Sequence, residues 1–165
     1  MCLMKKLYII RHAKSSWKDL SLSDFDRPLN KRGTNDAPLM GKMLKRKKIL
    51  PDLIISSPAK RAKTTAKVIA KEINYTESIV YDSDIYEAGM STLRNIIASI
   101  DDKNKSLFLF GHNPGLGMLV DCLVGLYKNI PTTGIVEIEF DCNKWKNISA
   151  TNAKLKSFKY PKMYK

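Results

Sequence analysis

Apolar residues in this chain occur either in short continuous runs or at positions that recur every three or four residues. The short runs are typical of strands, and the recurring positions are typical of helices that bury one face. The first and fourth runs show no polar alternation, which indicates strands covered on both faces of a sheet. Strands are therefore predicted over residues 6–11, 52–56, 79–81, 106–112, 135–140 and 153–158.

Helices are predicted between these strands, over 35–48, 58–73 and 91–100 and from Pro114 or Gly115 onward. The last of them is expected to bury Leu116, Leu119, Val120 and Leu123. A long polar connection, residues 14–32, follows the first strand, and connections of this length are often functional.

Strands that alternate with helices predict an α/β fold, with helices on both faces of a largely parallel sheet. We therefore expect three layers, α/β/α, around a mostly parallel mixed sheet whose closing strands add an antiparallel edge. The sequence shows no linker, repeat or low-complexity tract. Its 165 residues suffice for one core, so residues 1–165 are predicted to form one domain.

Composition changes this picture only through charge, because the formal net charge is +13. Such a field attracts anions, among them phosphorylated substrates, nucleic acid and acidic lipid. The lysines are scattered, and the one basic cluster, residues 42–48, fits a solvated helix end. The basic residues are not interleaved with surface aromatic residues and match no nucleic-acid-binding motif, so no specific nucleic acid is expected as a partner.

The remaining composition indicates a cytoplasmic protein without a membrane partner. The longest apolar runs are far shorter than a membrane span, and residues 1–6 lead into the first strand without a signal-peptide pattern. Cys2, Cys122 and Cys142 are odd in number and lack metal-binding or CxxC spacing, so reduced thiols are expected.

The two histidines of the chain carry the candidate chemistry, since each closes a predicted strand. Ligands of open α/β sheets bind beyond the carboxyl ends of the strands. His12 follows Arg11, whose guanidinium disfavours protonation of the ring and can bind phosphoryl oxygens bidentately. A neutral imidazole is a competent nucleophile toward phosphorus, so the pair Arg11–His12 suits phosphoryl transfer.

Two further segments indicate anion binding at helix starts. Ser57 is suited to cap a helix and Pro58 to begin it, which places Arg61 beside the free N–H groups of the first turn. The same pattern also fits an exposed capping turn with a surface arginine. His112 lies in Gly-His-Asn-Pro-Gly before the last helix, where its N–H can stabilise a phosphoryl oxygen.

Together these motifs resemble the histidine phosphatase superfamily, also called the phosphoglycerate mutase-like fold. The likeness rests on Arg-His-Ala at 11–13, Ser-x-x-x-Arg-Ala-x-x-Thr-Ala at 57–66 and Gly-His-Asn-Pro-Gly at 111–115, in the family's order. Within that superfamily, the chain resembles the SixA-type phosphohistidine phosphatases in the segments 11–17, 27–33, 36–38, 51–54 and 131–134. The resemblance covers nearly the whole chain.

The resemblance implies a phosphatase in which His12 becomes transiently phosphorylated while Arg11, Arg61 and His112 hold the phosphoryl oxygens. Neither a cofactor nor a metal is implied, and the expected partner is a phosphorylated protein or small phosphoester. Glu87 is the positional candidate for the general acid, although it could equally cap the following helix or lie in solvent.

Other residues are weaker candidates. Lys14, Ser15 and Asn113 are candidate phosphate contacts, and for Lys14 and Ser15 a surface role fits as well. Asp26 and Arg27 are expected to pair within the long loop. Trp17 fits a packed loop aromatic better than a pocket wall, and Thr133–Gly134 a turn near the site.

Two other functions fit parts of the sequence. A non-catalytic basic module that binds phosphate or nucleic acid would use the positive charge, but the intact set of Arg11, His12, Arg61 and His112 argues against it. A mutase would need insertions that enclose its substrate, and this short chain lacks them. The sequence predicts neither the physiological substrate nor the oligomeric state.

Overall fold

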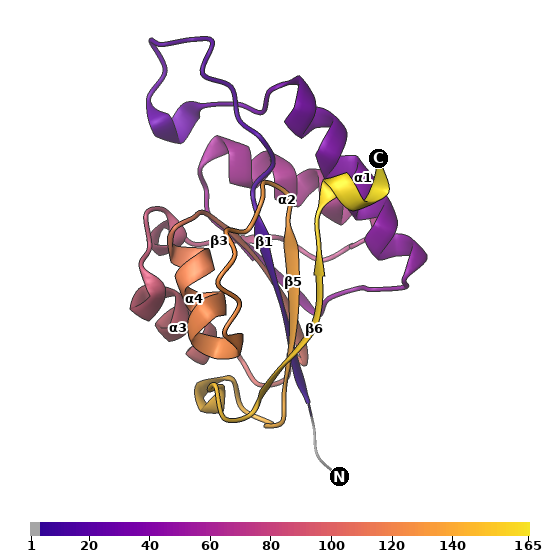
Figure 1. The fold of residues 1–165 in the computed structure, drawn as a ribbon, viewed down its shortest axis with the longest axis vertical. Helices are drawn as coiled ribbons and strands as arrows, with labels where there is room; N and C mark the ends of the chain where they lie inside the picture. The colour runs from indigo at the N-terminus through magenta and orange to yellow at the C-terminus, as the bar shows by residue number, and fades with distance from the viewer. Residues whose placement is uncertain (1–3) are drawn as a thin grey trace.

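The computed structural model describes residues 4–165, and its centre is a six-stranded sheet in the order β3-β2-β4-β1-β5-β6. The four strands β3, β2, β4 and β1 are parallel, whereas β5 is antiparallel to β1 and β6 to β5 (Figure 1). The predicted parallel sheet with an antiparallel edge is confirmed. The strands are β1 (Lys5–Arg11), β2 (Leu53–Ser56), β3 (Val80–Tyr81), β4 (Ser106–Gly111), β5 (Ile135–Phe140) and β6 (Ala153–Lys159).

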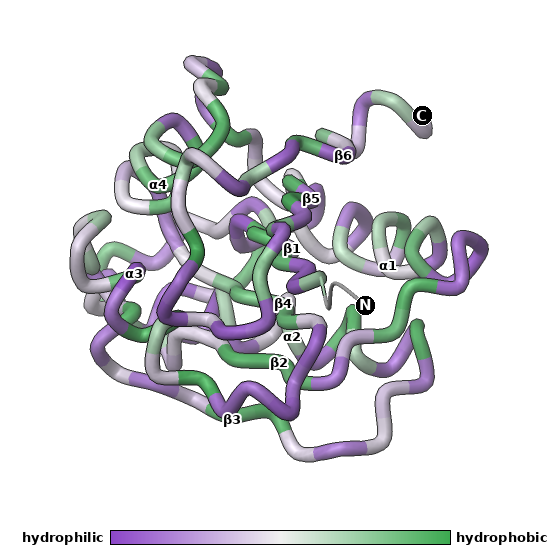
Figure 2. Tube along the Cα trace, turned by 90° about the horizontal axis from the view of Figure 1, so that it is seen from below, coloured by the Kyte–Doolittle hydropathy of each residue, from purple (hydrophilic) through white to green (hydrophobic). Residues whose placement is uncertain are grey.

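Helices cover both faces of this sheet, which confirms the three predicted layers (Figure 2). One face packs on α3 and α4, the other on α1 and α2. The alternation of β1 explains the division, since Leu7 and Ile9 face α3 and α4 while Tyr8 and Ile10 face α1 and α2. The helices are α1 (Lys31–Arg46), α2 (Lys60–Glu72), α3 (Met90–Ala98) and α4 (Gly115–Val124).

Two helix starts differ from the prediction. The first helix begins at Lys31 instead of Asn35, because the Asn30 side chain accepts a hydrogen bond from Gly33 N at 2.9 Å and caps it. The second helix begins at Lys60, so Ser57 is not its N-cap. The backbone N–H of Ser57 donates to Phe110 O at 3.0 Å, which extends the β2–β4 pairing past Ser56 and delays the helix.

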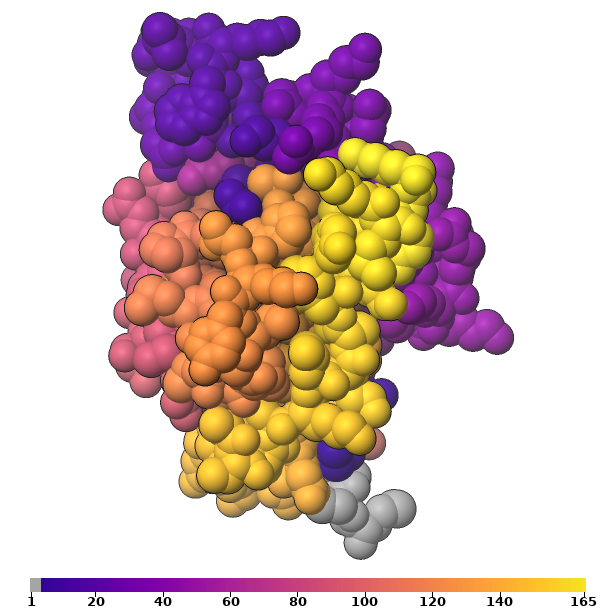
Figure 3. Space-filling view, viewed as in Figure 1, coloured from indigo at the N-terminus to yellow at the C-terminus, as the bar shows by residue number. Residues whose placement is uncertain are grey.

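The connection between β1 and α1 is short of regular structure but well tied. It contains the 3₁₀ turn η1 (Asp24–Asp26) and an isolated bridge between Ser15 and Leu29. Figure 3 shows this indigo segment overhanging the end of the molecule at which β1 finishes. The connection is therefore held over the carboxyl ends of the parallel strands.

The structure shows where the basic cluster and two of the three cysteines lie. The cluster 42–48 covers the end of α1 and the two residues after it, and its basic side chains are exposed, as predicted. Met43 and Leu44 within it are buried. Cys122 and Cys142 are free thiols, and Cys2 lies outside the described residues, as do residues 1–3 of the segment 1–6 that shows no signal-peptide pattern. Within residues 4–165, no helix combines the length and apolarity needed to cross a membrane.

Candidate active site

The neighbouring strands β1 and β4 bring the two histidines together. The strands are parallel and pair Arg11 with Gly111, so the next residue of each strand is a histidine at the same sheet end. The His12 and His112 rings lie 5.1 Å apart between centroids and are inclined by 50°. Both side chains therefore lie beyond the carboxyl ends of the strands, as expected.

His12 presents one ring nitrogen as a free base. Its Nδ1 lies 2.7 Å from Ala13 O, and a carbonyl only accepts, so Nδ1 carries the proton of the neutral ring. Its Nε2 lies 3.4 Å from Nε of Arg61, which donates to it. Burial, which has the largest effect, and the nearby His112, Arg61 and Arg11 together lower the pKa of His12 to about 3, against the opposing effect of Ala13 O. Burial therefore contributes more to neutrality than the adjacent arginine on which the sequence argument relied.

His112 is held through its other ring nitrogen. Its Nε2 lies 2.8 Å from the hydroxyl of Ser57, the first residue after β2. Burial, followed by the charge of Arg61, lowers the pKa of His112 to about 4, although Asp24 acts in the opposite direction. His112 O accepts from Leu116 N at 3.1 Å, so the residue lies at the entrance of α4 as expected.

Arg61 links His12 to the long loop. The residue lies in the first turn of α2, is only 6% exposed, and its Nη1 donates to Asp24 O at 2.7 Å. Its Nη2 forms an ion pair of 3.0 Å with Asp24 Oδ2. These two contacts with Asp24 fix the Arg61 guanidinium beside His12, the predicted nucleophile, with Nε next to the ring.

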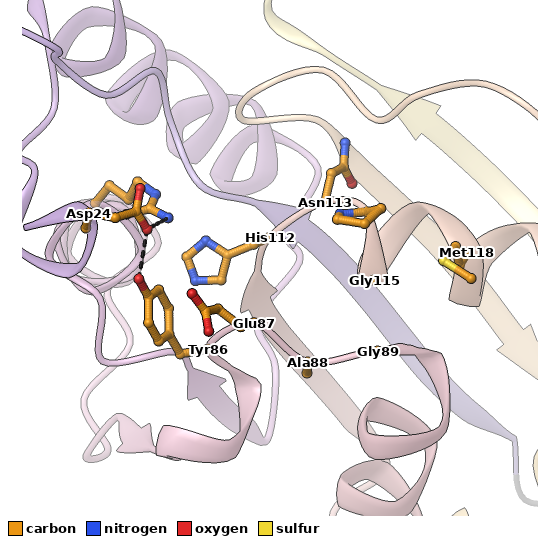
Figure 4. A pocket seen from close by; sticks show the side chains of 11 residues that line it. Asp24, Tyr86, Glu87, Ala88, Gly89, His112, Asn113, Gly115 and Met118 are labelled. Carbon is orange, nitrogen blue, oxygen red and sulfur yellow. Dashed lines mark hydrogen bonds and ion pairs between the residues drawn. The ribbon is translucent and has the colours of Figure 1, made fainter.

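The carboxylate of Asp24 accepts hydrogen bonds from four donor atoms. Besides Arg61, its carboxylate accepts from Nε and Nη2 of Arg27 at 3.1 and 3.0 Å. It also accepts from the Tyr86 hydroxyl at 2.7 Å (Figure 4). Partial burial raises its pKa, but the hydrogen bonds from Tyr86 and Arg27 and the charge of Arg61 dominate and lower it to about 2. Asp24 is therefore ionised at neutral pH.

A cleft of about 340 Å³ opens beside the His112 ring, and neither His12 nor Arg11 is among the residues that line it. Figure 4 shows His112 reaching into it between Asp24 and Glu87. Glu87 is exposed, and its φ of 60° lies in the left-handed region, which is costly for a residue with a Cβ. The lining residues are Asp24, Arg61, Tyr86, Glu87, Ala88, Gly89, His112, Asn113, Pro114, Gly115 and Met118.

Arg11 approaches the histidines from the side of the loop before β5. Its Nη1 donates to Ile130 O at 2.9 Å, while its Nε is buried with no hydrogen-bond partner among residues 4–165. Asn113 Nδ2 donates to the same carbonyl at 3.0 Å and also borders the cleft. The predicted turn at Thr133 lies here too, since its N–H is 3.1 Å from both Arg11 O and His12 O.

Lys14 and Ser15 serve the long loop in this structure. The Ser15 hydroxyl accepts from Nη1 of Arg27 at 2.7 Å, and Lys14 O accepts from Asn30 N at 2.9 Å. Neither residue is among those that line the cleft. Their contact with phosphate stays a prediction.

The expected pair of Asp26 and Arg27 is wrong. Arg27 pairs with Asp24, because the 3₁₀ turn brings residues three apart together, and Asp26 Oδ2 instead accepts from Ser23 Oγ at 2.9 Å. Trp17 is 64% exposed but covered on one ring face by the Arg27 guanidinium, 3.6 Å from the centroid. It acts as a loop aromatic.

Sequence reasoning assigned no site role to Asp24 or Tyr86 and gave Ser57 a different one. The position of Asp24 in a long polar loop and of Tyr86 beside Glu87 were the available signals, but neither indicates a contact across 62 residues. No cluster of three His, Cys, Asp or Glu side chains within residues 4–165 has the geometry to hold a metal ion.

A family model of the histidine phosphatase superfamily (branch 1) matches residues 7–114, a segment that includes His12, Arg61 and His112. The chain belongs to the histidine phosphatase superfamily. The resemblance inferred from the motifs is confirmed.

Relatives extend this match over most of the chain. An uncharacterised chloroplastic protein of Arabidopsis thaliana is 32% identical over 155 residues, which cover 88% of this chain and 71% of that protein. A crystal structure assigned to the phosphohistidine phosphatase SixA of Agrobacterium tumefaciens is 28% identical with a TM-score of 0.83, covering 95% of this chain and 98% of that one.

A second solved structure, the protein histidine phosphatase SixA complexed with tungstate, has a TM-score of 0.79 and 22% identity. It covers 97% of this chain and 99% of its own and shows the same fold. Within the superfamily, the chain is of the SixA type, and it is a phosphatase.

Proposed function

We propose that this phosphatase hydrolyses a phosphomonoester or a protein phosphohistidine through a phosphohistidine intermediate on Nε2 of His12. The observation that carries the proposal is the fixed tautomer of His12, whose Nδ1 is bound to Ala13 O while Nε2 lies beside Arg61. A neutral ring with an unprotonated Nε2 is the form that can attack phosphorus. Residues 1–165 would act as one catalytic domain.

In the first step, the Nε2 lone pair forms a bond to phosphorus as the bond from phosphorus to the leaving oxygen or nitrogen breaks. Arg61, Arg11 and His112 hold the three remaining phosphoryl oxygens. Such a transfer needs chiefly positioning and charge stabilisation, so two guanidiniums and an imidazole can supply it without a metal. The orphaned, buried Nε of Arg11 supports this role, because it is a donor without an acceptor among residues 4–165.

Glu87 is the proposed proton donor to a leaving oxygen. Its support is its place on the cleft wall beside His112 and its left-handed backbone, since strained residues cluster at functional sites (Figure 4). A phosphohistidine substrate has a leaving nitrogen and depends less on this proton. Asn113, which also borders the cleft, is proposed as a further phosphate contact.

In the second step, water attacks the phosphorus of phosphorylated His12 and releases inorganic phosphate and the free imidazole. Glu87, deprotonated by the first step, would accept the proton of that water. The cycle leaves the enzyme unchanged and consumes one water for each phosphate released.

The substrate class is supported by the similar SixA structures, of which one is a protein histidine phosphatase that holds tungstate, a tetrahedral oxyanion. The strongly positive chain also favours anionic partners. No other function is favoured by a specific contact of this site.

The deciding experiment measures hydrolysis of p-nitrophenyl phosphate by wild type and His12→Ala in the presence of a metal chelator. We expect turnover in wild type, inhibition by vanadate and an acid-labile, alkali-stable phosphoenzyme that is missing in His12→Ala. A panel of phosphorylated substrates, including a phosphorylated histidine-containing phosphotransfer protein, would then rank the substrate class. Phosphate binding without any turnover would favour a non-catalytic module, and full activity in His12→Ala would overturn the proposal.

A further inference from the structure

Ser57 follows β2 directly, and its hydroxyl does not cap α2. Ser57 is completely buried at the end of β2, and its Oγ lies 2.8 Å from Nε2 of His112. The same oxygen accepts the backbone N–H of Ala59 at 3.2 Å. These two contacts are its hydrogen bonds within the described part of the chain.

Counting donors and acceptors assigns the proton between Ser57 and His112. A hydroxyl has one hydrogen to donate, and Ala59 N–H can only donate, so the one available acceptor for the Ser57 hydrogen among residues 4–165 is Nε2 of His112. A neutral imidazole that accepts at Nε2 carries its proton on Nδ1. The Nδ1 of His112 is buried and has no partner among the described residues.

The opposite tautomer satisfies fewer groups. With the proton on Nε2, the Ser57 oxygen would accept twice, its own hydrogen would have no acceptor, and Nδ1 of His112 would be a buried lone pair without a donor. Two buried groups would then be unsatisfied instead of one, and buried polar groups are rarely left so. A doubly protonated ring is disfavoured as well, since the pKa of His112 is lowered to about 4.

We infer that Ser57 fixes neutral His112 in the tautomer with its proton on Nδ1, so that Nδ1–H donates to the phosphoryl group held next to His12. This inference rests on the proposed function for the identity of the acceptor, and Ser57 is a positioning residue because it acts through His112. The His112 ring borders the cleft (Figure 4). Its centroid lies 5.1 Å from that of the His12 ring, within reach of a group bonded to His12.

The first test reads the tautomer directly in the full chain without substrate. The protein is labelled with ¹⁵N-histidine, and its two histidines are distinguished with His12→Ala. Long-range ¹H–¹⁵N spectra at pH 7 are expected to show Nδ1–H and an unprotonated Nε2 for His112 in wild type. In Ser57→Ala, the His112 signals should move toward the Nε2–H form while those of His12 stay in place.

The second test asks what the tautomer contributes to turnover. We expect Ser57→Ala to lower kcat for p-nitrophenyl phosphate about 10- to 100-fold, less than the about 100- to 1,000-fold cost of deleting an oxyanion donor outright. Ser57→Thr retains the hydroxyl and should restore both the tautomer and most of kcat. The matched control is Ser56→Ala, which removes an equally buried hydroxyl that bonds Ser57 O at 2.9 Å and does not touch His112.

Three results would overturn the inference: an Nε2–H proton on wild-type His112, an unchanged His112 tautomer in Ser57→Ala, or an equal loss of kcat in Ser56→Ala. An Nε2–H proton in the wild-type spectrum would overturn the inference even if Ser57→Ala does not fold. Since that spectrum is recorded without substrate, the expected tautomer in a protein that hydrolyses no phosphate would reject the proposed function and leave the assignment of the proton intact.

Discussion

The ends of β1 and β4 are built alike, yet the histidine at each end presents a different ring nitrogen. Both strands are buried, parallel and adjacent, and each is followed by a histidine. At the end of β1, a backbone carbonyl binds Nδ1 of His12 and leaves Nε2 unprotonated, with only Arg61 Nε donating to it. At the end of β4, a serine hydroxyl binds Nε2 of His112 and leaves Nδ1 free.

The difference teaches that the partner of a histidine, more than its place in the fold, decides what the ring can do. A carbonyl can only accept, so it makes His12 a base toward the substrate. A hydroxyl whose oxygen already accepts from Ala59 N donates to His112 and makes that ring a donor. The carboxyl ends of these two strands thus place a nucleophile and an electrostatic partner side by side, with ring centroids 5.1 Å apart.

Replacing either histidine by alanine is the strongest way to break this comparison. We expect His12→Ala to abolish turnover of p-nitrophenyl phosphate, because no nucleophile remains. His112→Ala should retain a trace, with kcat lowered by about 100- to 1,000-fold, the cost of one oxyanion contact. Steady-state kinetics on both variants, with circular dichroism to check folding, would measure this, and equal losses in the two variants would contradict the assigned roles.

Arg61→Lys tests whether catalysis depends on the fixed guanidinium beside His12. Lysine keeps the charge but cannot contact His12, Asp24 and phosphate from one planar fork, so kcat/KM should fall by about 100-fold, at the lower end of the loss for an oxyanion donor. Arg46→Lys, at the exposed end of α1, is the matched control and should change kcat/KM less than twofold, as an approximate limit for surface exchanges. A loss of similar size in both variants would mean that the guanidinium geometry is unimportant.

Glu87→Gln sharpens the comparison by asking whether a third group joins the histidines. If Glu87 protonates the leaving group, hydrolysis of an alkyl phosphate should fall by about 100-fold, at the low end of general acid catalysis, while an activated aryl phosphate is affected far less. The measurement is kcat on both substrates, with Asp84→Asn as a control on a nearby exposed acid. Equal effects on the two substrates would rule out the acid role.

Acid titration of stability gives the most gradual effect. Both histidines have pKa values, about 3 and about 4, below the value near 6.5 of an unfolded chain. The unfolded chain therefore binds more protons below pH 6.5, so the free energy of unfolding is fully retained above that pH and falls on acidification. The slope is at most about 1.4 kcal/mol per pH unit for each histidine.

Urea unfolding at pH 7, 6, 5 and 4 would measure this slope, which continues to about pH 4 for His112 and about pH 3 for His12. The control is His112→Asn, which should remove about half of the slope between pH 6 and 5 because both rings contribute there. A free energy of unfolding that stays constant from pH 7 to 5 would show that neither ring is buried as neutral imidazole.

Much of the fold was predictable because its signals are local. The unbroken apolar run of β4 and the helical spacing of Leu116, Leu119 and Leu123 depend only on neighbouring residues, and both elements occur as predicted. The start of α1 was missed because Asn30 competes with several polar residues as a possible cap, and only the observed hydrogen bond to Gly33 distinguishes it.

The sequence alone determined the family, the sheet with its helices, and the placement of His12 and His112 at the same end of that sheet, since parallel strands have their carboxyl ends there. The adjacency of β1 and β4, which brings the two rings together, came from the tertiary structure. Only the tertiary structure decided which nitrogen each ring presents, that Asp24 binds Arg61, and that Ser57 contacts His112 instead of capping α2. Those contacts join residues dozens of positions apart. Their formation depends on packing across the whole sheet end, which no local pattern records.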